Sequence, residues 1–185
     1  MTIKQQIIIS GVGGQGVLFV TRLLAEAAMI KGFPVLTSET HGMAQRGGTV
    51  VSHLKVGDFS SPLIRPFSAD GLLALKPESL AQHGGFVKSG GWAIVNSRQP
   101  LQESGELMIT SVDADTLARA IGNLKSVNLI MLGAALSKLS GTKDLFCTLA
   151  DIQAVLNMQI SGAPSKLEKF TAAIDAGYRV YGMAK

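Results

Sequence analysis

The first part of the chain alternates between short apolar runs and a longer stretch of helical periodicity. Residues 7–9 are three consecutive isoleucines, a β-branched run that predicts a buried parallel strand. Apolar side chains then recur at helical spacing over residues 15–31, and Gly32 stands where a helix often ends on a C-cap glycine. Residues 34–37 predict a second strand. This strand–helix–strand unit spans about 30 residues, which is typical of a right-handed βαβ crossover.

The rest of the chain continues the same alternation. A strand is expected at residues 49–56, between a polar, glycine-bearing loop at 38–48 and a long excursion at 57–67 that contains two prolines. Asp113 is a favourable N-cap, and Pro164 is well placed to open the last helix. Further strands are expected at residues 72–75, 92–95 and 107–110, and helices at residues 77–83, 113–121, 128–139, 151–159 and 164–181.

This pattern predicts one α/β domain over residues 1–185, with a Rossmann-like, doubly wound architecture and a mostly parallel sheet. A chain of 185 residues can bury a sizeable core. Apolar residues make up 46% of the chain and charged residues only 16%, which favours a large core, a large interface, or both.

Composition argues against nucleic acid and membranes as partners. The net charge is +4, but the 17 basic residues are spread along the chain and aromatic residues amount to only 5%. No apolar run approaches the roughly 18 residues of a membrane helix, and residues 1–6 lack the features of a signal peptide. A cytoplasmic location is therefore the expectation.

The single cysteine, Cys147, excludes an internal disulfide and a self-contained iron–sulfur cluster, since a cluster needs about four thiolates. We expect it to be a small core residue. His41, His53 and His83 are not at metal-ligand spacing, so no metal site is predicted. His53 is expected on the more polar face of its strand.

The first motif is Gly-Val-Gly-Gly-Gln-Gly at residues 11–16, which follows a predicted strand and opens a helix. Glycines allow a tight turn and close approach of a ligand, and a helix N-terminus favours an anion. Glu39 lies roughly where a dinucleotide-binding protein places the acid that binds the ribose. A nicotinamide or flavin site is therefore one interpretation, and glycines that serve only helix–strand packing are another.

The second motif covers residues 38–48 and is dense in functional side chains. It is expected at the carboxyl end of the second strand, beside the first motif, where open α/β sheets bind ligands. Arg46 can bind a carboxylate or phosphate through two hydrogen bonds, and His41 can carry a proton or simply donate a hydrogen bond. The alternative is a polar surface loop.

Together the two motifs resemble the gamma subunit or domain of 2-oxoacid:ferredoxin oxidoreductases. The sequence of residues 39–48, Glu-Thr-His-Gly-Met-Ala-Gln-Arg-Gly-Gly, is most similar to the small (beta) subunit of indolepyruvate ferredoxin oxidoreductase. Residues 128–134 resemble the Asn-x-x-x-Leu-Gly-Ala stretch of that family, and residues 163–168 and 176–178 resemble its C-terminal helix.

The resemblance implies a thiamine-diphosphate-dependent enzyme that decarboxylates a 2-oxoacid, passes electrons through iron–sulfur clusters to ferredoxin, and releases an acyl-CoA. It implies no cofactor in this chain: thiamine diphosphate, magnesium and the clusters are expected in a larger partner subunit. The small subunit is expected to complete the partner's active site, with coenzyme A or the 2-oxoacid as a possible ligand at the interface.

The residues expected to bind ligand or face that active site come from both motifs, and no catalytic step is assigned to any of them. They are Gly11, Gly13, Gly14, Gln15, Gly16, Glu39, Thr40, His41, Gly42, Met43, Gln45, Arg46, Gly47 and Gly48. Two alternatives stay open: a stand-alone NAD(P)- or FAD-binding Rossmann protein, and a scaffold module without a ligand.

Overall fold

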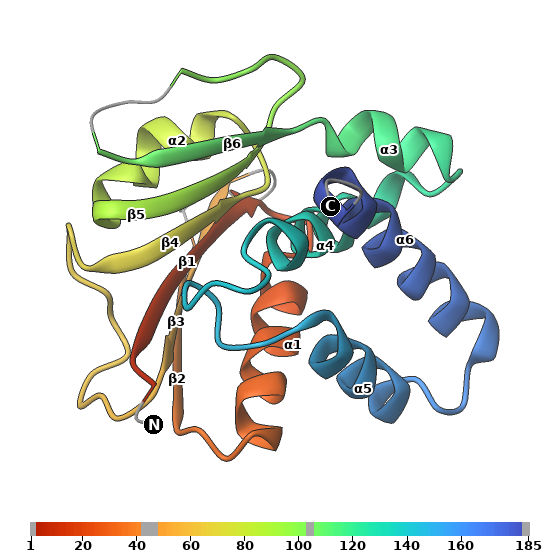
Figure 1. The fold of residues 1–185 in the computed structure, drawn as a ribbon, viewed down its shortest axis with the longest axis horizontal. Helices are drawn as coiled ribbons and strands as arrows, with labels where there is room; N and C mark the ends of the chain where they lie inside the picture. The colour runs from red at the N-terminus through yellow and green to blue at the C-terminus, as the bar shows by residue number, and fades with distance from the viewer. Residues whose placement is uncertain (1–2, 42–47, 103–105, 183–185) are drawn as a thin grey trace.

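A six-stranded sheet with helices against both faces forms the centre of the molecule (Figure 1). The computed structural model describes residues 3–41, 48–102 and 106–182. The strands are β1 (Gln5–Val12), β2 (Val35–His41), β3 (Thr49–Val56), β4 (Ala69–Ala74), β5 (Val87–Asn96) and β6 (Met108–Val112). The helices are α1 (Val17–Ile30), α2 (Glu78–His83), α3 (Ala114–Ala120), α4 (Val127–Lys138), α5 (Leu149–Gln159) and α6 (Pro164–Gly182), with 3₁₀ turns η1 (Gly84–Phe86) and η2 (Leu124–Ser126).

The strand order is β2-β3-β1-β4-β5-β6, and β3 runs against its neighbours. Strands β1, β4, β5 and β6 pair in parallel, which confirms the predicted mostly parallel α/β sheet. Strand β2 runs in the same direction as β1, because both pair antiparallel with β3. The predicted strand–helix–strand unit therefore encloses a third strand between its two strands, which the local pattern did not indicate.

The two faces of the sheet are covered unequally. Ile7 and Ile9 point into a large core beneath α1, α3, α4, α5 and α6, whereas Ile8 points into a smaller core on the other face. That second face is covered by the short α2, by η1 and by neighbouring loops (Figure 1). Since β1 is buried on both sides, its uninterrupted run of isoleucines fits the position of the strand.

Helices α4 and α6 cross with their backbones in contact. A β-carbon on Gly133 would overlap the carbonyl oxygen of Ile174, and one on Gly177 would overlap that of Ile130. Both glycines belong to the two segments that carry the family resemblance in the C-terminal half. Their role is therefore steric: only a hydrogen atom fits between the helices at this crossing.

Local capping signals predicted several helix ends correctly. Gly32 ends α1 in a left-handed conformation (φ 79°), and the Phe33 N–H donates to the Ala28 carbonyl at 3.0 Å. The Asp113 carboxylate accepts from the Thr116 N–H at 2.9 Å and so caps α3. Helix α5 begins before the predicted Asp151, because Thr148 forms a capping box with that aspartate.

The last helix starts at Pro164, as predicted. Within the described ranges, no helix is both long and apolar enough to cross a membrane.

Replacing Gly177 by alanine tests the contact between α4 and α6. Alanine favours a helix over glycine by about 1 kcal/mol, so an open position would gain stability. Here the new methyl group overlaps backbone atoms that cannot rotate away, and we expect Gly177→Ala to lower the unfolding free energy by at least about 2 kcal/mol. Urea denaturation measures this.

The matched control is Gly182→Ala near the end of the same helix, where the nearest neighbour of a β-carbon is a Tyr178 ring atom at an ordinary 3.5 Å. This variant should be neutral or slightly stabilising. Equal effects at the two positions would contradict the steric argument.

Candidate functional site

The two sequence motifs meet at one edge of the sheet. His41 of β2 pairs with Val50 of β3, and Val50 pairs with Gly11 of β1, so the three residues form one row. Just beyond this row, the Gly13 N–H donates to the Gly48 carbonyl at 3.0 Å. We call this edge, formed by residues 11–16, 39–41 and 48–49, the glycine edge.

The structure corrects the predicted loop at residues 38–48. Ser38, Glu39, Thr40 and His41 belong to β2, because backbone pairing with β3 continues as far as His41 despite their polar side chains. Glu39 and Thr40 are exposed on this outermost strand. The remaining residues predicted for the second motif lie outside the described residues: Gly42, Met43, Gln45, Arg46 and Gly47.

The first motif folds into a tight turn that the Gln15 side chain holds closed. The Gln15 N–H donates to the Val12 carbonyl at 3.1 Å, and its side-chain Oε1 accepts from the Val12 N–H at 2.9 Å. Its Nε2 donates to the Leu75 carbonyl at 3.4 Å, which ties the turn to the end of β4. A β-carbon on Gly11 would lie 2.8 Å from Gln15 Oε1, so this glycine leaves room for the inward amide.

Gly16 marks the start of α1, and Asn128 of α4 lies against it. Gly16 has a φ of 79°, and a β-carbon there would also overlap the Asn128 amide. The Asn128 Nδ2 donates to the Gly16 carbonyl at 3.4 Å and is almost completely buried. Asn128 was not among the predicted site residues, although the resemblance at residues 128–134 included it.

A small polar crevice opens beside the glycine loop, between β1 and α2. Helix α1 after β1 and helix α2 after β4 cover opposite faces of the sheet, so the crevice lies at a topological switch point, where open α/β sheets bind ligands. Its volume is about 250 Å³. It is lined by Gly11, Val12, Thr49, Lys76, Glu78, Ser79 and Gln82.

Sequence reasoning missed Lys76, Glu78 and Gln82. Their position in the sequence could have indicated them. They follow the predicted strand at residues 72–75, and the glycine motif follows β1, so both segments lie at the same edge of a parallel sheet. A larger cavity of about 720 Å³ lies on the far side of α2, among mostly apolar side chains of α2, β5 and β6, and shares no lining residue with the crevice.

A buried hydrogen-bonded cluster supports the floor of the crevice. The Ser10 hydroxyl lies 3.1 Å from the Ser79 hydroxyl and 2.9 Å from Nδ1 of His83. Burial lowers the pKa of His83 below its usual value. His83 is therefore neutral near pH 7 and joins α2 to β1 without adding a charge.

His53 lies close to His83 and is also neutral. It was expected on the polar face of β3, and it shares that face with Val51 and Lys55, but only 4% of its surface is exposed. Its Nδ1 accepts from the Ile64 N–H at 3.2 Å. Burial lowers the pKa of His53, and the proximity of two further basic groups, His83 and Lys55, lowers it further.

Cys147 is a core residue, as predicted, with 5% of its surface exposed. Burial raises the pKa of its thiol to about 12, and the nearby Asp151 adds to this effect. A thiol that stays protonated at neutral pH is a poor nucleophile and a poor metal ligand. Within residues 3–41, 48–102 and 106–182, no group of three or more histidine, cysteine or acidic side chains is arranged to hold a metal ion.

The geometry does not favour the dinucleotide alternative. In a dinucleotide-binding fold the acid that binds the ribose ends the strand beside β1. Here β3 occupies that place, and Glu39 is two strands away, which corresponds to roughly 9–10 Å across the sheet. In addition, protein acceptors already bind the N–H groups of Val12, Gly13 and Gln15.

Comparison with known proteins defines the class of this chain. The family described as pyruvate ferredoxin/flavodoxin oxidoreductase matches residues 6–180. The indolepyruvate oxidoreductase subunit IorB of Archaeoglobus fulgidus is 34% identical, over 70% of this chain and 75% of that subunit. The ketoisovalerate oxidoreductase subunit VorA of Methanothermobacter thermautotrophicus is also 34% identical over 70% of this chain, but the match spans only 27% of VorA.

Solved structures share the fold. The gamma subunit of a keto/oxoacid ferredoxin oxidoreductase from Geobacter sulfurreducens superimposes with a TM-score of 0.74, over 98% of this chain and 99% of that chain, at 24% identity. A 2-oxoglutarate:ferredoxin oxidoreductase from Magnetococcus marinus gives a TM-score of 0.79 at 20% identity, and this chain spans 32% of that chain.

These comparisons place the chain in the class of small, gamma-type subunits of 2-oxoacid:ferredoxin oxidoreductases. The chain belongs to the pyruvate ferredoxin/flavodoxin oxidoreductase family. The same fold occurs as a separate chain in the Geobacter structure and as part of a longer chain in the Magnetococcus structure.

The two buried histidines predict how stability depends on pH. Both have a folded-state pKa below the usual 6.5, so below about pH 6.5 the unfolded chain binds more protons than the folded chain. Their stabilising contribution is complete above that pH and is lost as the pH falls toward the folded-state pKa values. The slope is at most about 1.4 kcal/mol per pH unit for each histidine.

Urea denaturation at pH 7.5, 6.5 and 5.5 measures this loss. In His53→Asn, an amide oxygen can replace Nδ1 as the acceptor for the Ile64 N–H, but the side chain no longer titrates. The variant should therefore show a shallower decline than the wild type. Parallel stability curves for the two proteins would show that His53 does not contribute.

Proposed function

We propose that this chain serves an indolepyruvate-type enzyme, in which its glycine edge completes the active site of a larger subunit. The observation that carries the proposal is the hydrogen bond between Gly13 and Gly48, which holds the two characteristic motifs of the sequence side by side. The 34% identity with an indolepyruvate oxidoreductase subunit supports an aryl 2-oxoacid as the substrate.

The polar groups of the glycine edge suit an anionic group of the 2-oxoacid or of coenzyme A. Gly14 carries no side chain that would obstruct a ligand, and a β-carbon there would meet only open space. The N-terminus of α1 directs the positive end of its dipole toward this edge. Lys76 adds a positive charge from the neighbouring crevice. These groups bind and orient a ligand.

The redox and decarboxylation chemistry is assigned to the partner. Thiamine diphosphate and magnesium bound there would supply the decarboxylation, and iron–sulfur clusters would pass the electrons to ferredoxin. This chain contributes a single buried cysteine with a high pKa, which does not suit it to ligate a cluster. Its own part is to close and shape the ligand site, in a cytoplasmic complex.

Reconstitution tests the proposal. The chain is co-expressed with a large subunit that carries thiamine and cluster-binding motifs, and the purified complex is assayed with indolepyruvate, phenylpyruvate, a branched 2-oxoacid and pyruvate. We expect CoA-dependent ferredoxin reduction that requires both subunits and is highest with the aryl substrates. Highest activity with pyruvate or a branched 2-oxoacid would overturn the substrate assignment, and activity of the large subunit alone would overturn the role of this chain.

Arg46 tests the glycine edge itself. His41 and Gly48, which flank this part of the motif in the sequence, lie at the glycine edge, and a guanidinium group suits an anionic ligand. Arg46→Ala should assemble normally but reduce turnover of the complex by at least about tenfold, which corresponds to a loss of roughly 1.4 kcal/mol in the transition state.

Arg22→Ala is the matched control, because Arg22 is exposed on α1 beyond its first turn. It should leave turnover unchanged. If the Arg46 variant assembles and turns over as fast as the wild type with every accepted 2-oxoacid, the assignment of Arg46 to the site is wrong.

A further inference from the structure

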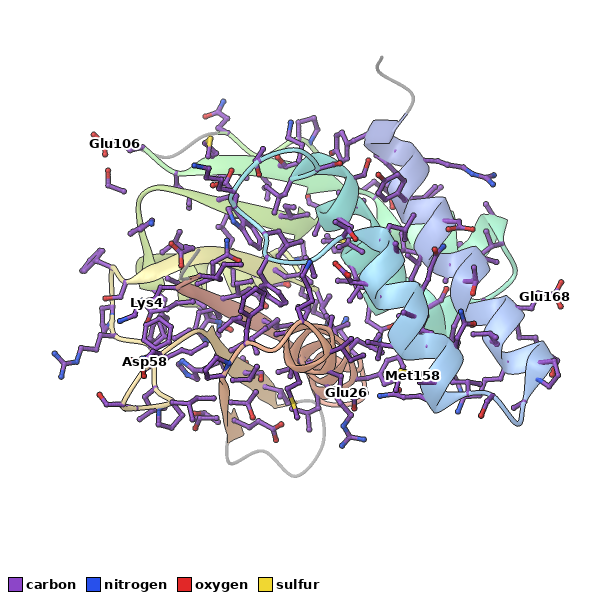
Figure 2. All side chains as sticks on the ribbon, turned by 60° about the horizontal axis from the view of Figure 1, so that its bottom comes forward. Lys4, Glu26, Asp58, Glu106, Met158 and Glu168 are labelled. Atoms are coloured by element: carbon purple, nitrogen blue, oxygen red, sulfur yellow. The ribbon has the colours of Figure 1, made fainter. Side chains whose placement is uncertain are left out.

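The loop between β3 and β4 forms a second polar pocket, at the end of β1 opposite to the glycine edge. We call it the basic pocket. Its volume is about 210 Å³, and the residues that matter for its chemistry are Lys55, Phe59, Ser60, Ser61, Arg65 and Ser68. Figure 2 shows Lys4 and Asp58 on this side of the molecule, far from Met158 of α5 and Glu168 of α6.

Lys55 is the unusual residue of the pocket. Only 7% of its surface is exposed, yet its ammonium group makes no hydrogen bond or ion pair with any residue that the structure describes. Its neighbour is the Phe59 ring, whose centroid lies 5.0 Å from Nζ. A cation–π contact offsets only part of the cost of removing an ammonium group from water, so an anionic partner would stabilise this group further.

Further cationic and hydroxyl groups surround the same space. Arg65 lines the pocket, and Lys4 Nζ lies 5.3 Å from the centroid of the same Phe59 ring. Burial lowers the pKa of Lys55, and the positive charge of Arg65, which lines the same pocket, lowers it further. The hydroxyl groups of Ser60 and Ser61 form no hydrogen bond with other described side chains.

The nearby carboxylates do not neutralise this charge. No aspartate or glutamate is among the described residues that line the pocket. Asp70 is already bound to the Lys88 ammonium at 2.6 Å and to the Gln6 N–H at 2.7 Å. Asp58 precedes Phe59 but is exposed and does not line the pocket.

We propose that the basic pocket binds a phosphate group, either as inorganic phosphate or as the phosphate of a small monoester. A phosphate dianion would balance the charges of Lys55 and Arg65, and its oxygens would accept hydrogen bonds from the serine hydroxyls. The volume lies below the 300–1,000 Å³ typical of pockets for drug-sized ligands, which favours a single anionic group. This proposal does not depend on the proposed function, because it rests on the opposite end of β1.

The test measures phosphate binding to the full chain and to the assembled complex by calorimetry and thermal unfolding. The probes are inorganic phosphate, glycerol 3-phosphate and acetate, with sodium chloride at matched ionic strength. We expect saturable phosphate binding with a Kd of about 1 mM or tighter, and at least tenfold weaker binding of acetate. Tighter binding of glycerol 3-phosphate than of inorganic phosphate would identify a monoester as the ligand.

Two variants locate the binding. Lys55→Met removes the unpaired charge and keeps an apolar side chain of similar length, so without phosphate it should unfold at a temperature equal to or about 2–4 °C above that of the wild type. It should also lose the rise in unfolding temperature that phosphate gives the wild type. Arg65→Gln changes an exposed side chain and should weaken phosphate binding at least tenfold. Lys169→Gln, exposed on α6, is the control and should bind like the wild type.

Three results would overturn the proposal. The first is a response to phosphate no larger than that to sodium chloride, and the second is equal binding by the wild type and both pocket variants. The third is binding by the free chain that disappears in the complex, which would assign the pocket to an acidic segment of the partner. Oxidoreductase assays do not enter these measurements, so failure here leaves the proposed function unaffected.

Discussion

The backbone hydrogen bonds that β3 forms on both of its sides determine the arrangement of this protein. They fix the register of β2 against β1, so that His41, Val50 and Gly11 form one row. This register places the ends of the two motifs next to each other along the strands, which allows the hydrogen bond between the Gly13 N–H and the Gly48 carbonyl. The same strand keeps Glu39 away from β1, which makes the glycine edge different from a dinucleotide site even though its first motif has the same spacing of glycines.

The start of α1 depends on packing far from the sheet edge. Asn128 at the beginning of α4 holds the Gly16 carbonyl, and α4 in turn is held against α6 by the contact at Gly133 and Gly177. A displacement of α6 would therefore be transmitted to the glycine loop through one helix. This connection gives a physical reason why three short segments that are distant in the sequence, residues 11–16, 128–134 and 176–178, belong together in the resemblance.

The buried polar groups at the two ends of β1 differ in how they are neutralised. Ser10, Ser79 and His83 beneath the crevice form a hydrogen-bonded cluster without net charge, which costs little to bury. Lys55 at the other end of β1 carries a charge without a carboxylate beside it. The neutral cluster stabilises the scaffold, whereas the unpaired charge of Lys55 is better explained by an anionic ligand.

Features that depend on neighbouring residues could be predicted from the order of the amino acids alone. The isoleucine run of β1, the cap residues Gly32 and Asp113, and the start of the last helix at Pro164 are all local signals, and each was predicted correctly. The burial of Cys147 was expected because a cysteine without a disulfide partner is usually a small core residue. The two motifs were sufficient to identify the family.

Features that depend on distant partners became evident only in the folded chain. The pairing with β3 extended β2 through Glu39 to His41, and the inward turn of Gln15 became evident from the position of Leu75. The unpaired state of Lys55 likewise depends on where the loop of residues 57–68 lies. Strand order, helix crossings and charge balance arise from contacts between residues far apart in the chain, and the periodicity of a sequence contains no information on which strand will lie beside which.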